Sequence, residues 1–321
     1  MADCLVTGGA GFIGSHIVRG LLDAGHRVRV LDNLCSGHRS NLDDVAAKIE
    51  FIEGDICDDP SVVRSLKGIK RVFHQAALAS VPLSLERPMD THLACATGTL
   101  NLLRHSVAAG VKKFVYAASS SAYGDQPTSS KRESDLPMPL SPYAAAKLAG
   151  ELYCQAYYHS FGLDTVGLRY FNVFGPRQDP NSPYSAVIPL FVTKILSQSK
   201  PDIYGDGMQS RDFTFVANVV HGNLLAAEKS NIGGRIFNVA DGRQTTLLKL
   251  LELLSKHLGR SISPNFLPAR TGDVRESLAD ISRARSELGY EPKFTLEEGL
   301  QQTIAFYQRT TQSILPSNAT A

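Results

Sequence analysis

CLVTGGAGFIGSHIV, at residues 4–18, runs from a short apolar segment through Gly8, Gly11 and Gly14 into an amphipathic stretch. This order predicts a buried strand, a tight turn and a helix in direct succession. Gly8 permits the turn, Gly11 lets the backbone approach a ligand, and Gly14 lets the helix pack on the strand. The start of the helix also presents free N–H groups and a positive dipole end. The stretch therefore indicates a pyrophosphate site; the alternative is a glycine-rich turn that binds nothing.

Short β-branched runs alternate with longer amphipathic stretches outward from there, as far as residue 172. This alternation is typical of βαβ units that wind a parallel sheet, and therefore of an α/β fold. We expect further strands at 27–31, 49–52, 72–74, 114–118 and 164–170, and long helices at 12–24 and 141–161.

The sequence changes character after Asn172, where Gly-Pro, Asp-Pro-Asn and Ser-Pro follow one another. Such a turn-rich passage marks the boundary of a smaller lobe. Residues 235–239 again have the pattern of a strand, which could return to the main sheet. We expect a helix at 296–307 and a loose tail at 310–321.

Composition excludes several classes of protein. The 321 residues are 43% hydrophobic without a run of 18 apolar residues, so we expect no membrane span. The formal net charge is only +2 and the basic residues are scattered along the chain, which argues against a nucleic-acid partner. Five cysteines without a C-x-x-C pair, and no leader segment, favour the reducing cytoplasm. The nine histidines are not spaced as metal ligands usually are, so we expect no metal site.

Asp32 ends the second predicted strand, 18 residues after the last glycine of the motif. A carboxylate there can accept hydrogen bonds from the ribose hydroxyls of NAD and would repel the 2′-phosphate of NADP. Arg39 nearby could soften this discrimination, and a simple strand-end cap is the alternative. Asp55 and Ile56 follow the third strand, where an adenine would lie.

Tyr143 and Lys147 stand four residues apart in a predicted helix, so their side chains share one face. Three serines at 119–121 end a predicted strand, where open α/β sheets bind ligands. A phenol needs its pKa lowered by roughly 3 units, about 4 kcal/mol, to act as a base near neutrality. One positive charge about 4 Å away contributes on the order of 4 kcal/mol at an effective dielectric near 20. Lys147 with an oxidised nicotinamide could therefore make Tyr143 a general base and acid. An exposed helical pair is the alternative.

Four motifs occur in order: TGGAGFIG at 7–14, YAAAK at 143–147, LRYFNV at 168–173 and RDF at 211–213. On these motifs the chain resembles the extended short-chain dehydrogenase/reductases over nearly its whole length. Within them it is most similar to the UDP-sugar 4-epimerases, in particular the branch that acts on N-acetylated hexosamines. The resemblance implies a doubly wound Rossmann NAD-binding domain at 1–172, which a strand near 235–239 rejoins. It implies a mixed UDP-sugar-binding lobe, mainly at 173–321, and a homodimer.

The resemblance implies NAD-dependent 4-epimerisation through a transient 4-keto sugar. The substrates would be UDP-N-acetylglucosamine and UDP-N-acetylgalactosamine, or UDP-glucose and UDP-galactose. In related dehydratases and decarboxylases an acidic residue typically follows the strand-end serine or threonine, whereas Ser120, Ser121 and Ala122 follow here. This favours simple removal and return of hydride. The alternatives are a UDP-glucuronate epimerase or decarboxylase, or a dinucleotide sensor without catalysis.

The resemblance also assigns residues to the site. Tyr143, Lys147 and either Ser119 or Ser121 would be catalytic, with Ser119 the better match. The cofactor would be bound by Gly8, Gly11, Phe12, Ile13, Gly14, Asp32, Asn33, Asp55, Ile56, Ala77, Tyr143, Lys147 and Tyr170. The substrate would be bound by Ser80, Ser119, Ser120, Asn172, Gln178, Ala186, Arg211, Arg270, Asp273 and Ser277.

Among the implied substrate residues, Asn172, Arg211 and Arg270 would hold the diphosphate. Ser277 would leave room for an acetamido group, because relatives confined to glucose and galactose can carry a tyrosine there. Cys95 stands where the family usually has an asparagine, which puts one contact near the nicotinamide in doubt.

Overall fold

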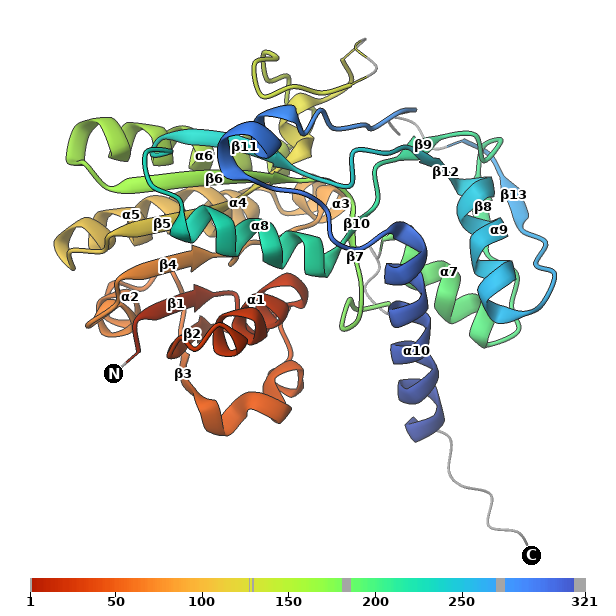
Figure 1. The fold of residues 1–321 in the computed structure, drawn as a ribbon, viewed down its shortest axis with the longest axis horizontal. Helices are drawn as coiled ribbons and strands as arrows, with labels where there is room; N and C mark the ends of the chain where they lie inside the picture. The colour runs from red at the N-terminus through yellow and green to blue at the C-terminus, as the bar shows by residue number, and fades with distance from the viewer. Residues whose placement is uncertain (1, 127, 129, 181–185, 270–274, 315–321) are drawn as a thin grey trace, which may run out of the picture.

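The computed structural model describes residues 2–126, 128, 130–180, 186–269 and 275–314 (Figure 1). Seven parallel strands form its central sheet in the order β11-β6-β5-β4-β1-β2-β3. The chain thus extends the sheet in one direction from β1 to β3 and in the other from β4 onward. This is the predicted doubly wound Rossmann arrangement, and it opens a crevice where β1 and β4 end. The strands are β1 (Cys4–Thr7), β2 (Val28–Asp32), β3 (Ile49–Glu53), β4 (Arg71–His74), β5 (Lys113–Ser119), β6 (Asp164–Tyr170) and β11 (Arg235–Val239).

Helices cover both faces of this sheet. Phe114 and Tyr116 of β5 point to one face, and Val115 and Ala117 point to the other. Burial on both faces explains why these strands are apolar without alternation. The Phe114 face packs on α2 (Asp59–Leu66), α5 (Gly98–Ala108) and α6 (Pro142–Phe161), and the Val115 face on α1 (Phe12–Asp23) and α8 (Val216–Glu228). The remaining helical segments of this part are η1 (Arg39–Lys48), α3 (Val81–Glu86), α4 (Pro88–His92), η2 (Leu93–Thr97), η3 (Ser120–Tyr123) and η4 (Ala284–Leu288).

A smaller lobe lies beside the carboxyl ends of the strands and has its own apolar core (Figure 1). Its helices are α7 (Val187–Leu196), α9 (Leu247–Leu258) and α10 (Leu296–Ile314). Short strands pair around them: β7 (Val173–Phe174) with β10 (Thr214–Phe215), β8 (Asp202–Tyr204) with β13 (Asn265–Leu267), and β9 (Ser210–Arg211) with β12 (Thr245–Thr246). The mixed lobe therefore matches the predicted fold class.

The chain alternates between the two parts after residue 172. It builds α7, β8 and β9 in the lobe, returns to the sheet with α8 and β11, and leaves again with β12. Two domains divided at 172, with 235–239 rejoining the first, stay a prediction. The loose tail expected from residue 310 was wrong at its start, because α10 continues to Ile314. Among the described residues, no helix has the length and apolar character needed to cross a bilayer.

Candidate active site

The glycine motif forms a cradle that larger residues would fill. Gly8 has φ +68°, in the left-handed region that favours glycine. An added Cβ at Gly14 would lie 2.1 Å from the carbonyl oxygen of Gly8, and one at Gly11 would lie 3.2 Å from it. Helix α1 begins at Phe12 with Gly11 as its N-cap, and no side chain caps it. The first N–H groups of α1 are therefore left to bind a ligand.

A cavity of ≈ 310 Å³ extends from this cradle across the carboxyl ends of β1, β2 and β4. All thirteen residues expected to bind the cofactor line it: Gly8, Gly11, Phe12, Ile13, Gly14, Asp32, Asn33, Asp55, Ile56, Ala77, Tyr143, Lys147 and Tyr170. Gln75, which follows β4, and the loop of Cys35, Ser36 and Gly37 after β2 also line the cavity and were not predicted. The position of Gln75 at a strand end was a usable signal. The loop had none, because its path depends on contacts with Ala10.

Asp32 is held at the edge of this cavity by the backbone. Its Oδ2 accepts a hydrogen bond from Ala10 N at 2.8 Å, and its Oδ1 accepts one from Leu34 N at 2.9 Å. Burial raises the pKa of this carboxyl, and the two backbone donors oppose that shift. The Arg39 guanidinium lies 4.0 Å from the centre of the Phe51 ring, and Arg39 is not among the residues that line the cavity. Among the described residues that line the cavity, Asp32 thus offers a carboxylate and no arginine accompanies it.

Tyr143 and Lys147 reach the same cavity from the first turns of α6. Ser141 starts this helix, because its Oγ accepts a hydrogen bond from Ala144 N at 3.1 Å. Removal from water raises the pKa of the Tyr143 phenol, and a hydrogen bond with Ser119 lowers it in smaller measure. Burial also lowers the pKa of the Lys147 ammonium. The protein alone therefore does not give Tyr143 the lowered pKa that a base requires, and a further positive charge must supply it.

Ser119 is the serine whose hydroxyl interacts with Tyr143. Its Oγ lies 2.8 Å from the Oγ of Ser121 and accepts a hydrogen bond from Ser121 N at 3.2 Å. Ser120 is the next residue and begins η3. The structure thus brings Ser119 to Tyr143 directly and Ser121 only through Ser119.

A second cavity, of ≈ 390 Å³, lies in the smaller lobe and contains Asn172, Ala186 and Arg211. Asn172 has φ +32° and lies where β7 meets β10, since its carbonyl oxygen accepts a hydrogen bond from Thr214 N at 3.2 Å. Phe213 and Tyr204 line this cavity as well and were not predicted. Three of the expected substrate residues thus share one cavity.

The other expected substrate residues lie elsewhere. Ser80 caps α3 through Leu83 N at 3.1 Å, and the Gln178 amide donates to Val173 O at 3.2 Å. Ser277 lies beside β9, because its N–H donates to Ser210 O at 3.2 Å. Arg270 and Asp273 lie outside the described residues.

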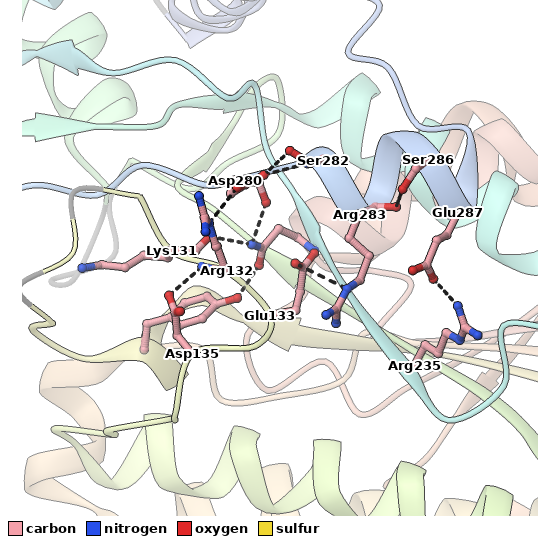
Figure 2. Close-up of polar contacts among 12 residues, drawn as sticks. Lys131, Arg132, Glu133, Asp135, Arg235, Asp280, Ser282, Arg283, Ser286 and Glu287 are labelled. Carbon is pink, nitrogen blue, oxygen red and sulfur yellow. Dashed lines mark hydrogen bonds and ion pairs between the residues drawn. The ribbon is translucent and has the colours of Figure 1, made fainter.

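A polar network holds the segment after Ser277 against β11 (Figure 2). Asn238 of β11 donates its side-chain amide to Lys131 O at 2.9 Å and to Asp280 O at 3.0 Å. Glu133 accepts a hydrogen bond from Asn238 N at 2.7 Å. The buried Asp212 carboxylate accepts one from Ala279 N at 3.1 Å. These contacts, with the hydrogen bond from Ser277 N to Ser210 O, hold Ser277 beside β9.

Cys95 does not line the first cavity. Its side chain is fully buried among Ala96, Ala146 and Tyr143, and its thiol lies 4.0 Å from Leu78 O. The residue that replaces the usual asparagine therefore packs behind the cavity wall.

Residues 4–240 match the family model described as the NAD dependent epimerase/dehydratase family. The chain belongs to this family. One relative in it is the UDP-glucose 4-epimerase of Mycolicibacterium smegmatis, 38% identical over 96% of this chain and 99% of that protein. The solved UDP-N-acetylglucosamine 4-epimerase of Methanobrevibacter ruminantium, in complex with UDP-N-acetylmuramic acid, is 42% identical with a TM-score of 0.91. The UDP-glucose 4-epimerase of Thermotoga maritima, with UDP-glucose, is 40% identical with a TM-score of 0.91. In both comparisons the match covers 96% of this chain and 99% of the chain in the solved structure.

The geometry of the first cavity fits the cofactor of the epimerase/dehydratase family. Glycines leave the space that a pyrophosphate needs, and the Asp32 carboxylate is placed for a ribose. This family member is therefore an NAD-dependent enzyme.

Proposed function

We propose that the protein is a UDP-sugar 4-epimerase that acts on UDP-N-acetylglucosamine and UDP-N-acetylgalactosamine, and also on UDP-glucose and UDP-galactose. One observation carries the proposal: Tyr143 and Lys147 line the same cavity as the glycine cradle, and Ser119 interacts with Tyr143. The epimerases among the relatives and solved structures support the same activity.

The chain would hold the cofactor mainly through its backbone. The N–H groups of Phe12 and Ile13 would bind the pyrophosphate, and Asp32 the adenosine ribose. The side chains of Asp55 and Asn33 are joined by a hydrogen bond of 2.6 Å at the end where the adenine would lie. Bound NAD would supply a hydride acceptor, later a hydride donor, and a positive charge.

Proton transfer would be the task of Tyr143. Its phenolate oxygen removes the proton of the sugar 4-hydroxyl while C4 loses a hydride, which leaves a 4-keto sugar. Ser119 donates a hydrogen bond to the sugar oxygen and stabilises the charge that develops there. After the keto sugar has turned, Tyr143 would return the proton to the oxygen while the opposite face of C4 regains the hydride. The mass of the sugar is unchanged.

The lobe would bind the nucleotide more firmly than the sugar. Arg211 and Asn172 line the second cavity and would bind the diphosphate, and Arg270 and Asp273 stay predictions. Ala186 in the same cavity and Ser277 beside β9 are small residues that leave room for an acetamido group. A sugar with few contacts of its own can rotate after oxidation.

A homodimer is also part of the proposal. Leu85, Met89 and Leu93 of α3, α4 and η2 are exposed, as are Leu152 and Tyr153 of α6. These elements pack side by side (Figure 1), so their apolar side chains offer one surface to a second copy.

All five cysteines are free thiols, which supports a location in the cytoplasm.

A panel of UDP-sugars tests the proposed reaction. Purified protein is incubated with UDP-N-acetylglucosamine, UDP-glucose or UDP-glucuronate, without added reductant, and the products are separated and weighed by mass spectrometry. We expect 4-epimers of the first two at unchanged mass, and none with the control variant Tyr143→Phe. Loss of water or carbon dioxide, or turnover of UDP-glucuronate alone, would contradict the proposal.

A further inference from the structure

Lys147 carries its charge at a buried position without an anionic partner. Its side chain is 3% exposed, and among the described residues no carboxylate forms an ion pair with it. The titratable groups that face it are Tyr143, Glu151 and Cys154 on α6, Cys95 on η2, His74 on β4 and Tyr116 on β5. A buried ammonium with no compensation would lose its proton readily.

None of the other facing groups supplies a free negative charge near neutral pH. Glu151 binds Arg169 through both oxygens, at 2.9 Å and 2.5 Å. Burial raises the pKa of the Cys95 and Cys154 thiols, so both stay protonated. Burial lowers the pKa of His74 to about 3, so this imidazole is neutral.

Tyr116 presents an aromatic ring to the ammonium. The Lys147 Nζ lies 4.4 Å from the centre of this ring, within the range of a cation–π contact. The Tyr116 hydroxyl donates a hydrogen bond to Lys147 O at 3.0 Å, which holds the ring beside the lysine. Gly150 makes room for it, since a Cβ there would lie 2.3 Å from the Tyr116 hydroxyl oxygen. The ring is fully buried and its hydroxyl stays protonated, because burial raises the phenol's pKa.

We infer that Tyr116 is a positioning residue whose ring face keeps Lys147 protonated and in place beside Tyr143. The inference rests on the proposed role of Lys147 in the epimerisation. The Tyr116 ring gives the buried ammonium a partner that does not neutralise the ammonium charge. The positive charge of Lys147 therefore stays available to the phenolate of Tyr143.

Two variants separate the ring from its hydroxyl. Tyr116→Phe keeps the ring face and loses the hydrogen bond to Lys147 O, whereas Tyr116→Leu loses both. We expect the alkaline limb of the pH profile of kcat/KM to move down by roughly 0.5 to 1 pH unit in Tyr116→Leu, because a weaker cation partner lowers the pKa of Lys147. In Tyr116→Phe the limb should stay in place. A loss of packing alone would lower the rates without moving the limb, and that result in Tyr116→Leu would overturn the inference, as would an equal shift in Tyr116→Phe.

A second measurement does not depend on any turnover. Acetic anhydride acetylates only neutral amines, so mass spectrometry of Lys147 acetylation against pH reports its pKa directly. We expect the half-point to fall in Tyr116→Leu and to stay in Tyr116→Phe. If Tyr116→Leu does not fold, pentafluorophenylalanine at position 116 keeps the ring shape and removes its attraction for cations. An unchanged half-point with that ring would overturn the inference, even in a protein that showed no epimerase activity.

Discussion

Two serine hydroxyls lie near Tyr143, and the proposed mechanism needs one of them to donate a hydrogen bond to the sugar oxygen. Ser119 interacts with Tyr143, and Ser121 reaches it only through Ser119 at 2.8 Å. We expect Ser119→Ala to lower kcat by about 100-fold, in the range for losing one donor to a developing negative charge. Ser121→Ala should cost about tenfold or less by the same reasoning. Turnover of a UDP-sugar at saturating concentration measures both, with Tyr143→Phe as the inactive reference. A larger loss in Ser121→Ala would make Ser121 the donor.

The residue at 277 is expected to decide which sugars enter. Ser277 is tied to Ser210, and the nearby Ala279 to the Asp212 carboxylate, so a larger side chain at 277 cannot easily move aside. Ser277→Tyr should lower kcat/KM for UDP-N-acetylglucosamine by about tenfold or more and leave that for UDP-glucose nearly unchanged. Ser277→Ala, which adds no bulk, is the control. Equal losses on both substrates would remove Ser277 from substrate selection.

At the scale of the element, two glycines in the turn between β1 and α1 should serve different ends. Gly14 is needed for the stability of the fold, and Gly11 for cofactor binding. A Cβ at Gly14 would meet Gly8 O at 2.1 Å, so Gly14→Ala must displace backbone and should destabilise the fold by about 3 kcal/mol or more. A Cβ at Gly11 would lie 3.2 Å from the same oxygen, which a small shift can accommodate. We expect Gly11→Ala to fold but to lose bound NAD, because the methyl group occupies the approach to the pyrophosphate.

Thermal unfolding and the NAD content of purified protein measure the two effects separately. Gly14→Ala should unfold at a lower temperature, and Gly11→Ala should unfold near the wild-type temperature once NAD has been removed from both. Full NAD content in Gly11→Ala would show that the cradle is wider than proposed.

Elements with a strong local signal could be predicted from the sequence, and the others could not. Strand β6 was expected at its exact bounds, and α6 within one residue, because Ser141 and Pro142 mark its start. The two-residue strands of the lobe have no periodicity to detect, since distant partners create them. In α10 the part that the sequence predicts is also the part that packs, because Leu300, Ile304 and Tyr307 are buried at helical spacing.

At the scale of the whole molecule, the two cores meet at the cofactor turn. Ile13 of α1 and Val173 of β7 pack against both the core of the sheet and the core of the lobe. The cofactor cradle and the lobe that contains Arg211 therefore share side chains. Sequence patterns predicted the cradle and the Tyr143–Lys147 pair, because each is local. They could not predict this shared packing, because it depends on the folded chain, whereas Gln75 in the cavity wall could have been found from its position at a strand end.

Acid should weaken the whole fold through two histidines, the fully buried His74 and the partly buried His16. His74 bridges the hydroxyls of Thr7, at 2.7 Å, and Thr99, at 2.9 Å, and burial lowers its pKa to about 3. His16 has its pKa lowered to about 3 by burial and by Arg177. In the unfolded chain a histidine has a pKa of about 6.5. Below that pH the unfolded state binds a proton that the folded state does not, so stability is complete above pH 6.5 and is lost as the pH falls towards 3.

The expected loss at pH 5 is about 2 kcal/mol for each histidine, from roughly 1.5 pH units at 1.36 kcal/mol per unit. Urea unfolding at pH 7.5 and pH 5.0 gives the two free energies of unfolding. His74→Gln can still bridge Thr7 and Thr99 but cannot be protonated, so its stability should fall by about 2 kcal/mol less than that of the wild type between these pH values. His38→Gln is the control, because the His38 side chain is 61% exposed. If His74→Gln lost as much stability as the wild type, the imidazole would have to be protonated in the folded protein, and its neutral bridge from the cofactor turn to α5 would be wrong.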